Sequence, residues 1–362
     1  MKVMLLKPNL LLPSNGGDIS IIEYFSLFQT WGWKVEIHLL VNNKIREYLE
    51  THQDLWKVKI TKRGYQIRDL EIDLHSQDHI DHHEVHHQQI FEGFFEKLLS
   101  ERRPDVGFGH YTDFFATSSL CRWNPNRSFI FQTDNEFPRL DQLQSFKAIH
   151  ESFSKIKNFL VASSFMKSQV QKAYPDSSVF ELLNVLAILD SDDEISFDSN
   201  RYWTFVNPVP VKGRDFFLSL AKALPEVNFQ VVENWGQSSD LSLNLENVRV
   251  RQAERDIRRV FKSAKGLLMP SIWEEAFGRL PLEAMHFGLP VLASNRGALP
   301  QTLGGGGSAL DLDVKLWAEK INEVDALQED WIKRAKDRVH QYRQDRDLSL
   351  KNFRDLIENI VR

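Results

Sequence analysis

The 362-residue sequence has one cysteine, a small net charge and no long apolar run, and each shortage excludes a class of protein. Cys121 has no second cysteine to pair with, which predicts a reducing, cytoplasmic setting and a buried thiol. The formal net charge of -5 does not fit a general polyanion binder, so no nucleic-acid partner is expected. No run approaches the roughly 18 apolar residues that a membrane-spanning helix needs, so membrane association should be peripheral at most.

The N-terminal residues 1–17 do not read as a targeting signal. Lys7 and Pro8 interrupt their apolar stretch, and no small-residue cleavage pattern follows. We therefore expect a first β-strand here and a cytoplasmic protein.

Apolar side chains are plentiful, at 42% of the sequence, and 25 Phe and 9 Trp are available to fill cores. The length fits two domains better than one. Short apolar runs alternate with longer stretches of helical period, which is typical of parallel sheets covered by helices. The acidic, non-periodic segment 191–200 separates two such series. The sequence thus predicts an α/β fold with Rossmann-like, doubly wound domains at 1–190 and 201–345, followed by a C-terminal helix at 346–362.

The expected elements follow from these runs. In the first half they are strands within 3–6, 35–41, 103–110 and 129–134, a helix at 18–32, and a strand, serine cap and helix within 158–174. In the second half they are strands at 203–207, 228–232, 247–250, 266–269 and 290–294, helices at 213–224, 254–264 and from near Pro281, and helical period over 313–343.

A glycine pair follows the first expected strand. Gly16 and Gly17 allow close backbone approach to a ligand, and Asp18 can cap the helix after them. An ordinary tight turn is the alternative for this piece taken alone.

Six histidines crowd into residues 75–89. His79, His83 and His86 would share one face of a helix, and zinc sites use such donors. No motif fixes which of them would be ligands, so a solvated polar helix face is the favoured interpretation and no metal site is predicted.

Two carboxylates flank the helix expected near Pro281. Residues 266–269 end a strand, so Glu275 lies in a loop at the carboxyl edge of the sheet, where open α/β folds bind ligands. Pro281 suits the first helical position, which would put Glu283 in the first turn. Free amides at a helix start suit a phosphate, and carboxylates suit sugar and ribose hydroxyls. This pattern fits a nucleotide diphosphate-sugar, unless Glu283 merely favours the helix dipole.

At this point the sequence resembles the family 4 glycosyltransferases, a retaining group with the GT-B fold. The resemblance is strongest over 203–308 and includes the family's E-x7-E signature at Glu275 and Glu283. The other matching segments are Pro270-Ser271, Phe277-Gly278, Ala284-Met285, Gly288-Leu289-Pro290-Val291, Gly16-Gly17, 103–106, 161–170 and Lys212-Gly213.

The resemblance implies two domains facing across a cleft, with a C-terminal helix that returns to the first domain. It implies a nucleotide diphosphate-sugar as co-substrate, with no other cofactor and no metal. Glu283 would hold the ribose, Glu275 the donor sugar, and Lys212 would neutralise the departing diphosphate. The backbone of Ala276, Phe277 and Gly278 would meet the sugar or phosphates, and Gly16 and Gly17 would approach the donor from the opposite wall.

The sequence departs from the family pattern at three positions. Asn207 stands where the family has an Arg, and Arg279 beside Gly278 is a candidate to supply the missing charge. Thr133, before Asp134, stands where the family has a histidine, and His110 is a candidate catalytic substitute. Gln301 replaces a family Glu.

Three functions stay open at this stage. The leading one is transfer of a hexose-type sugar to an unidentified acceptor, whether a saccharide, a lipid-linked molecule or a small molecule. The second is a nucleotide-sugar-binding protein that has lost transfer and acts as a partner or scaffold. The third, a dinucleotide oxidoreductase suggested by 304–309, is disfavoured because that glycine run lacks a strand directly before it. The donor nucleotide is not determined by the sequence.

Overall fold

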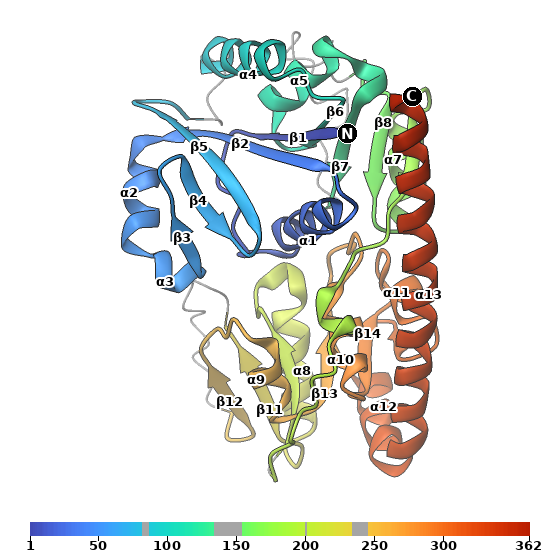
Figure 1. Ribbon diagram of the computed structural model, residues 1–362. Coiled ribbons are helices and arrows are strands. Elements are labelled where there is room, and N and C mark those ends of the chain that lie inside the picture. The colour runs from blue at the N-terminus through green and yellow to red at the C-terminus, as the bar shows by residue number, and fades with distance from the viewer. Residues whose placement is uncertain (82–86, 134–153, 200, 234–244) are drawn as a thin grey trace. The chain divides into compact units, whose positions relative to one another are not determined.

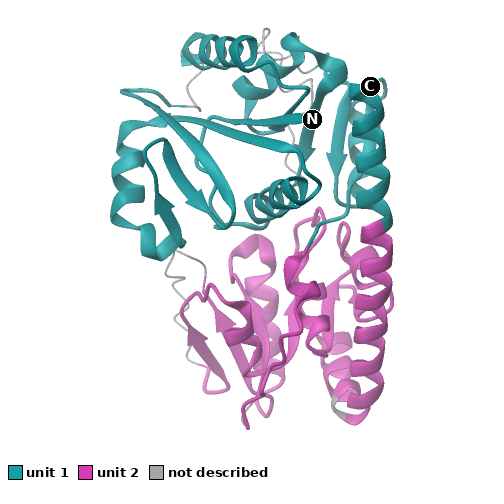
Figure 2. Ribbon diagram, in the orientation of Figure 1, with its two compact units in different colours: residues 1–185, 348–362 teal, residues 186–347 magenta. Residues whose placement is uncertain are grey.

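The computed structural model describes residues 1–81, 87–133, 154–199, 201–233 and 245–362 (Figure 1). The chain divides into two compact units, coloured in Figure 2. Unit 1 contains Met1–Val185 and Leu348–Arg362, and unit 2 contains Leu186–Asp347. The α/β fold with two Rossmann-like domains is therefore confirmed.

Unit 1 is built on a sheet with the strand order β3-β4-β5-β2-β1-β6-β7-β8-β9. Its strands pair in parallel except at β3–β4 and β4–β5, which are antiparallel. The strands are β1 (Lys2–Lys7), β2 (Lys34–Asn42), β3 (Val58–Ile60), β4 (Gly64–Ile67), β5 (Leu70–Gln77), β6 (Val106–His110), β7 (Ser128–Gln132), β8 (Asn158–Val161) and β9 (Ser178–Glu181). The expected strands are present, whereas the antiparallel strands β3 and β4 and the strands β5 and β9 were not predicted.

Helices cover both faces of this sheet, with α1 on one side and α4 and α5 on the other (Figure 1). The helices are α1 (Gly16–Thr30), α2 (Asn43–Thr51), α3 (Gln53–Trp56), α4 (Gln88–Arg102), α5 (Phe114–Trp123) and α7 (Ser164–Ala173), with a 3-10 turn η2 (Pro125–Arg127). Ser163 caps α7 as expected, because its side chain accepts a hydrogen bond from Met166 N.

The C-terminal residues complete the aromatic core of unit 1. Phe353 stacks on Phe28 of α1, with ring centroids 5.8 Å apart, and meets Phe129 of β7 edge-on at 6.0 Å. Leu350 and Ile357 are buried in the same core. Leu350, Phe353 and Ile357 lie on α13 (Gln328–Val361), a single helix whose earlier residues belong to unit 2.

The start of α1 differs from the prediction. Asn15 is the N-cap, and its Oδ1 accepts a hydrogen bond from Asp18 N at 2.9 Å. The helix therefore begins at Gly16 and Asp18 lies inside its first turn. Asn and Asp are nearly equivalent as N-caps, so composition alone did not decide between them.

The histidine-rich segment is also not one helix. Residues up to Gln77 belong to strand β5, and His79 has a φ of 56°, a left-handed conformation that no α-helix contains. His83 and His86 lie outside the described residues. Within the described residues, no three side chains of His, Cys, Asp or Glu are arranged to hold a metal ion.

Unit 2 has a six-stranded, wholly parallel sheet with the order β12-β11-β10-β13-β14-β15. The strands are β10 (Tyr202–Val206), β11 (Phe229–Val232), β12 (Val248–Arg251), β13 (Ala264–Met269), β14 (Val291–Ser294) and β15 (Ser308–Leu310). The chain proceeds from β10 outward to β12 and then returns to the other side at β13. The point where strand order reverses thus lies between β10 and β13, and there open α/β sheets bind ligands.

The helices of unit 2 are α8 (Arg214–Ala223), α9 (Ile257–Phe261), α10 (Arg279–His286), α11 (Leu299–Leu303), α12 (Val314–Ala326) and most of α13, with 3-10 turns η4 (Ala187–Asp190) and η5 (Pro210–Lys212). Their core contains the fully buried Trp203, Trp317 and Trp331. The helix expected over 254–264 is shorter, because Asp256 caps α9 and starts it at Ile257.

No helix among the described residues is long and apolar enough to cross a membrane. Cys121 is buried, as expected, and burial raises the pKa of its thiol to about 12.

Candidate functional site

The turns at the carboxyl ends of β10 and β13 bring Lys212 and Glu275 together in unit 2. Lys212 Nζ donates to Glu275 Oε1 at 2.6 Å. The lysine side chain is 30% exposed to solvent, whereas the glutamate side chain is 11% exposed. Two residues 63 positions apart, both predicted as site residues, thus form a direct ion pair at the point of strand-order reversal.

A second donor holds the same carboxylate oxygen. Ser271 Oγ, which is buried, donates to Glu275 Oε1 at 2.9 Å. Ser271 is held in turn by its own carbonyl, which accepts from Ser294 Oγ at 2.6 Å. Within the described part of the chain, Oε2 of Glu275 has no hydrogen-bond partner. One carboxylate oxygen is therefore fixed by the protein and the other is available.

Two glycines with positive φ let the loops around Glu275 pack closely. Gly213, at φ 88°, lies against the carbonyl of Pro270, where a Cβ would overlap the backbone. Gly297, at φ 57°, lies against the backbone N and O of Glu275, and the carbonyl of Glu275 accepts from Ala298 N at 2.8 Å. Both positions need glycine for conformation and for space.

Glu283 pairs with Arg279 one helical turn earlier, at 3.5 Å, and both side chains are largely buried. Helix α10 begins at Arg279 after the N-cap Gly278, so Pro281 is its third residue and Glu283 lies beyond the first turn. The predicted start was wrong by two residues. Proline is tolerated there because the first turn of a helix has no intrahelical partners for its N–H groups.

Ala276 and Phe277, between the two glutamates, are nearly buried. The Phe277 ring packs on Tyr342 of α13, with centroids 5.8 Å apart, and its carbonyl accepts from Thr302 Oγ1. The Phe277 side chain is therefore part of the core of unit 2, which leaves backbone atoms as its means of meeting a ligand.

Asn207 ends β10 in a left-handed conformation, with φ 61°. Its N–H donates to Val232 O and its carbonyl accepts from Val209 N, both at 2.8 Å. Its Oδ1 is buried and has no hydrogen-bond partner in the described residues. Asparagine tolerates this backbone region better than arginine does, which gives a local reason for its presence.

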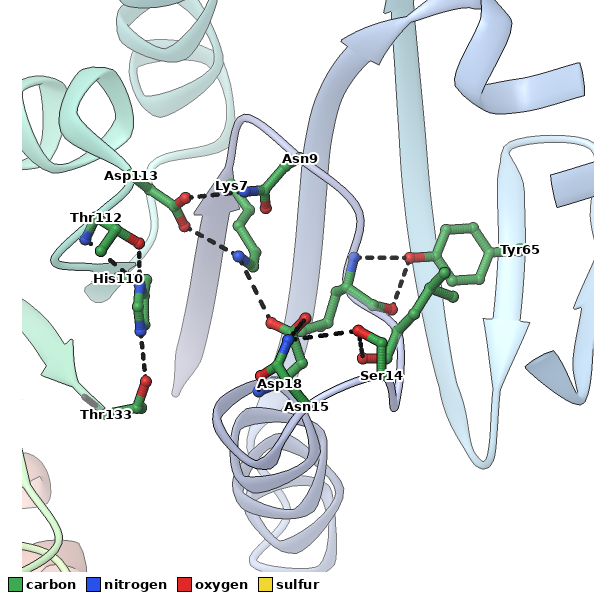
Figure 3. A network of polar contacts seen from close by, with 12 residues as sticks. Lys7, Asn9, Ser14, Asn15, Asp18, Tyr65, His110, Thr112, Asp113 and Thr133 are labelled. Atoms are coloured by element: carbon green, nitrogen blue, oxygen red, sulfur yellow. Dashed lines mark hydrogen bonds and ion pairs between the residues drawn. The ribbon is translucent and has the colours of Figure 1, made fainter. Parts of the chain in front are cut away.

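In unit 1 the point of strand-order reversal lies between β1 and β6, and a polar network occupies it (Figure 3). Lys7, the last residue of β1, lies 3.2 Å from Asp113 Oδ2 and 3.6 Å from Asp18 Oδ1. Asn9 Nδ2 donates to the second oxygen of Asp113 at 3.3 Å. Burial raises the pKa of Asp113 to about 6 despite the nearby ammonium. One lysine thus faces two carboxylates.

His110, at the end of β6, lies beside this network (Figure 3). Its Nδ1 is 2.7 Å from Thr112 Oγ1, and its Nε2 is 2.7 Å from Thr133 Oγ1. Burial, with a smaller contribution from Lys7, lowers the pKa of His110 to about 3, so the ring is neutral at pH 7. The predicted site residue His110 therefore contacts Thr133, the residue that the sequence comparison placed at the position of the family's histidine.

The two N-terminal glycines lie at the start of α1. A Cβ on Gly17 would come within 2.6 Å of Thr133 Oγ1, so Gly17 lets the turn approach the end of β7. Gly16 is the first residue of the helix, and its carbonyl accepts from Ser20 Oγ at 2.9 Å.

Comparison with known proteins gives this architecture a family context. Sucrose-phosphate synthase from Thermosynechococcus elongatus superimposes with a TM-score of 0.72 at 12% identity, covering 99% of this chain and 98% of that one. Anabaena Alr3699/HepE in complex with UDP superimposes with a TM-score of 0.70 at 14% identity, covering 99% of this chain and all of the other. The chain has the GT-B fold.

The sequence match to a GT-B family lies in unit 2. Residues 209–344 match the family model described as glycosyl transferases group 1, and they include Lys212, Glu275 and Glu283. Spore coat protein SA of Bacillus subtilis (strain 168) is 32% identical over 74 residues, which are 19% of this chain and 20% of that protein. The matched segment thus spans about a fifth of that relative's length.

Sequence reasoning missed several residues of these two sites. Lys7 and Asp113 are 106 positions apart and belong to no motif, so only the sheet order brings them together. Ser271 was noted as part of a matching segment but not as a partner of Glu275. Gly297 carried a weak signal, because a glycine after the strand at 291–294 marks a turn.

Proposed function

We propose that this protein is a retaining glycosyltransferase that moves a hexose-type sugar from a nucleotide diphosphate-sugar to an acceptor hydroxyl. The observation that carries the proposal is the Lys212–Glu275 pair at the strand-order reversal of unit 2, inside the segment that matches the group 1 family. An ammonium beside a carboxylate with one available oxygen suits a phosphate linked to a polyol.

Lys212 has the main catalytic task in this proposal. Cleavage of the donor leaves negative charge on the diphosphate, and a preorganised ammonium there can contribute several kcal/mol of transition-state stabilisation, on the order of 3. Glu275 would accept from a hydroxyl of the donor sugar through its available Oε2, and Glu283 would accept from the ribose.

The charges of the site balance before a donor arrives. Lys212 is paired with Glu275, and Arg279 with Glu283. When each glutamate accepts a hydrogen bond from a donor hydroxyl, the paired lysine or arginine can also interact with the diphosphate. Asn207 would add a hydrogen-bond donor through Nδ2 without adding charge.

The proposed chemistry uses no protein nucleophile. Glu275 Oε1 already accepts from Lys212 and Ser271, which makes that oxygen a poor nucleophile. Attack would instead come from the acceptor hydroxyl on the face that the diphosphate leaves. The bond from the anomeric carbon to the phosphate oxygen breaks as the new glycosidic bond forms, and the acceptor proton passes to a phosphate oxygen. We propose that no metal is required.

Donor binding is the first test. A thermal-shift screen against UDP-, GDP- and ADP-sugars should show one class that raises the melting temperature, because a ligand that binds only the folded state stabilises it. UDP-glucose is a rational starting probe, since HepE has been solved in complex with it. Glu283→Ala should abolish the shift. Unchanged binding of every donor by that variant would refute the assignment of Glu283.

A second candidate function is donor binding without transfer. Asn207 in the place of a family arginine favours it, because an amide cannot neutralise a leaving diphosphate. Titration calorimetry combined with assays for transfer and for donor hydrolysis separates the two functions. Binding with neither reaction, over a panel of saccharide and lipid-linked acceptors, would favour the second.

A further inference from the structure

Ser271 lies two residues after the end of β13, on the turn that leads to Glu275. Its side chain is buried, with the whole residue 1% exposed. The hydroxyl has two acceptors within reach, Glu275 Oε1 at 2.9 Å and Val211 O at 3.5 Å. The charged acceptor at the shorter distance is the stronger partner, so the single hydroxyl proton points to Glu275.

The backbone of Ser271 is fixed on both sides. Its carbonyl accepts from Ser294 Oγ on β14, and the next amide, of Ile272, donates to Val211 O at 3.0 Å. The hydroxyl therefore belongs to a rigid element, whereas Lys212 has a long side chain that keeps 30% of its exposure. Of the two groups that hold Glu275 Oε1, Ser271 is the one with a fixed position.

We propose that Ser271 is a positioning residue: with Lys212 it holds Oε1 of Glu275, so that Oε2 is presented to a hydroxyl of the donor sugar. The inference rests on the proposed donor site. A carboxylate with one oxygen held at two points can rotate little, and the direction of its free oxygen is set before the ligand arrives. Ser271 acts through Glu275 and does not itself contact the sugar.

The position of Ser263 offers a matched control. Ser263 lies directly before β13, at the opposite end of the strand, and it is also buried, at 2% exposure. Its Oγ donates a hydrogen bond to Gln230 Oε1 at 3.1 Å and not to Glu275. Ser263→Ala thus removes a similarly buried serine hydroxyl near the other end of the same strand.

The test compares a nucleotide sugar with its free nucleoside diphosphate, starting with UDP-glucose and UDP and extending to GDP- and ADP-sugars. Ser271→Ala should weaken binding of the nucleotide sugar about tenfold, as expected for a lost hydrogen bond to a charged group, with a much smaller effect on the diphosphate alone. Ser263→Ala should leave both affinities unchanged. In a Glu275→Ala background, Ser271→Ala should have no further effect, because its partner is gone.

The outcomes distinguish this inference from the proposed function. Wild-type protein that binds none of the nucleotide sugars overturns both. Wild-type binding that Ser271→Ala leaves intact, or an equal loss in the Glu275→Ala background, overturns the role of Ser271 alone. If Ser271→Ala does not fold, Ser271→Cys takes its place in both backgrounds, because a thiol has a similar shape and is a weak donor. It should weaken binding of the nucleotide sugar less than Ser271→Ala would, and again with little effect on the free diphosphate.

Discussion

Lys7 Nζ lies 3.2 Å from Asp113 Oδ2, and both side chains are at least 95% buried. A buried ion pair that loses one partner leaves an uncompensated charge, which is far more costly than the loss of a pair in water. This contact joins the end of β1 to the N-cap residue of α5.

Lys7→Met should lower the free energy of unfolding by about 3–5 kcal/mol, because the Asp113 carboxylate then keeps Asn9 as its one side-chain donor among the described residues. Urea unfolding at pH 7 would measure it. Lys34→Met is the control, since Lys34 pairs with Glu36 at 3.2 Å but its side chain is 70% exposed. That variant should change stability by less than about 1 kcal/mol. Equal effects of the two variants would contradict the assigned importance of burial.

The pH dependence of stability should include a clear contribution from His110. Its pKa is about 3 in the folded protein, because of burial, against an ordinary value of 6.5. Between pH 3 and 6.5 the unfolded chain therefore binds a proton at His110 that the folded protein does not bind. The stability that neutral His110 contributes is complete above pH 6.5 and is lost as the pH falls toward 3. Asp113, whose folded pKa is raised to about 6, opposes this change between about pH 4 and 6.

His110→Gln removes the histidine contribution and retains a side chain that can hydrogen-bond Thr112 or Thr133. The slope of unfolding free energy against pH should fall, relative to the wild type, by about 1.4 kcal/mol per pH unit between pH 6 and 4. Chemical unfolding at a series of pH values gives both slopes. Parallel curves would mean that His110 is already protonated in the folded protein at these pH values.

Gly297→Ala should disturb the Glu275 loop. A Cβ there would overlap the backbone of Glu275, and φ is 57°, so the loss should be at least about 2 kcal/mol, accompanied by loss of donor binding. Gly305→Ala is a matched control, because Gly305 has a similar φ of 84° with no atom within 4 Å of the new Cβ. It should cost about 1 kcal/mol from strain alone and leave donor binding intact. Calorimetry on both variants would separate overlap from strain.

Lys212→Met tests the leaving-group role. Transfer should fall at least about a hundredfold if the ammonium stabilises the departing diphosphate, and binding of the free nucleoside diphosphate should weaken as well. Stability should fall less than in Lys7→Met, because the Lys212 side chain is 30% exposed and Glu275 keeps Ser271 as a donor. Initial rates with excess donor give the comparison. A variant with wild-type kcat would require another cation at the diphosphate.

Most strands of the parallel part of both sheets could be predicted because each is a short apolar run followed by a helical period. The parallel strands β5, β9 and β15 were missed, since β5 alternates apolar and polar residues and β9 and β15 have four and three residues. The strands β3 and β4 also lack such runs, since Lys59, Lys62 and Arg63 interrupt the apolar residues of 58–67, and they were missed too. The presence of a helix was easier to predict than the residue at which it begins. Asn15 and Asp18 compete as caps on equal terms, and Pro281 fits any position of a first turn.

The two sites differ in how far the sequence determines them. Lys212 and Glu275 each follow a strand at the carboxyl edge of one sheet, so their meeting follows from the predicted topology. The contact between Lys7 and Asp113 needs the order of strands, which apolar periodicity does not specify. The position of Ser271 relative to Glu275 depends on turn geometry set by Gly213 and Gly297, at a level of detail that residue spacing does not contain.

The single helix α13 has a consequence for biosynthesis. Leu350, Phe353 and Ile357, which fill the core of unit 1, are translated after all of unit 2, whereas the rest of that core is translated before it. Unit 2 ends at Asp347, so all its residues are translated before Phe353. The portion of the chain made first must therefore wait until translation has passed unit 2 and reached Ile357 before its hydrophobic interior can close, which reverses the usual N-to-C order of co-translational folding.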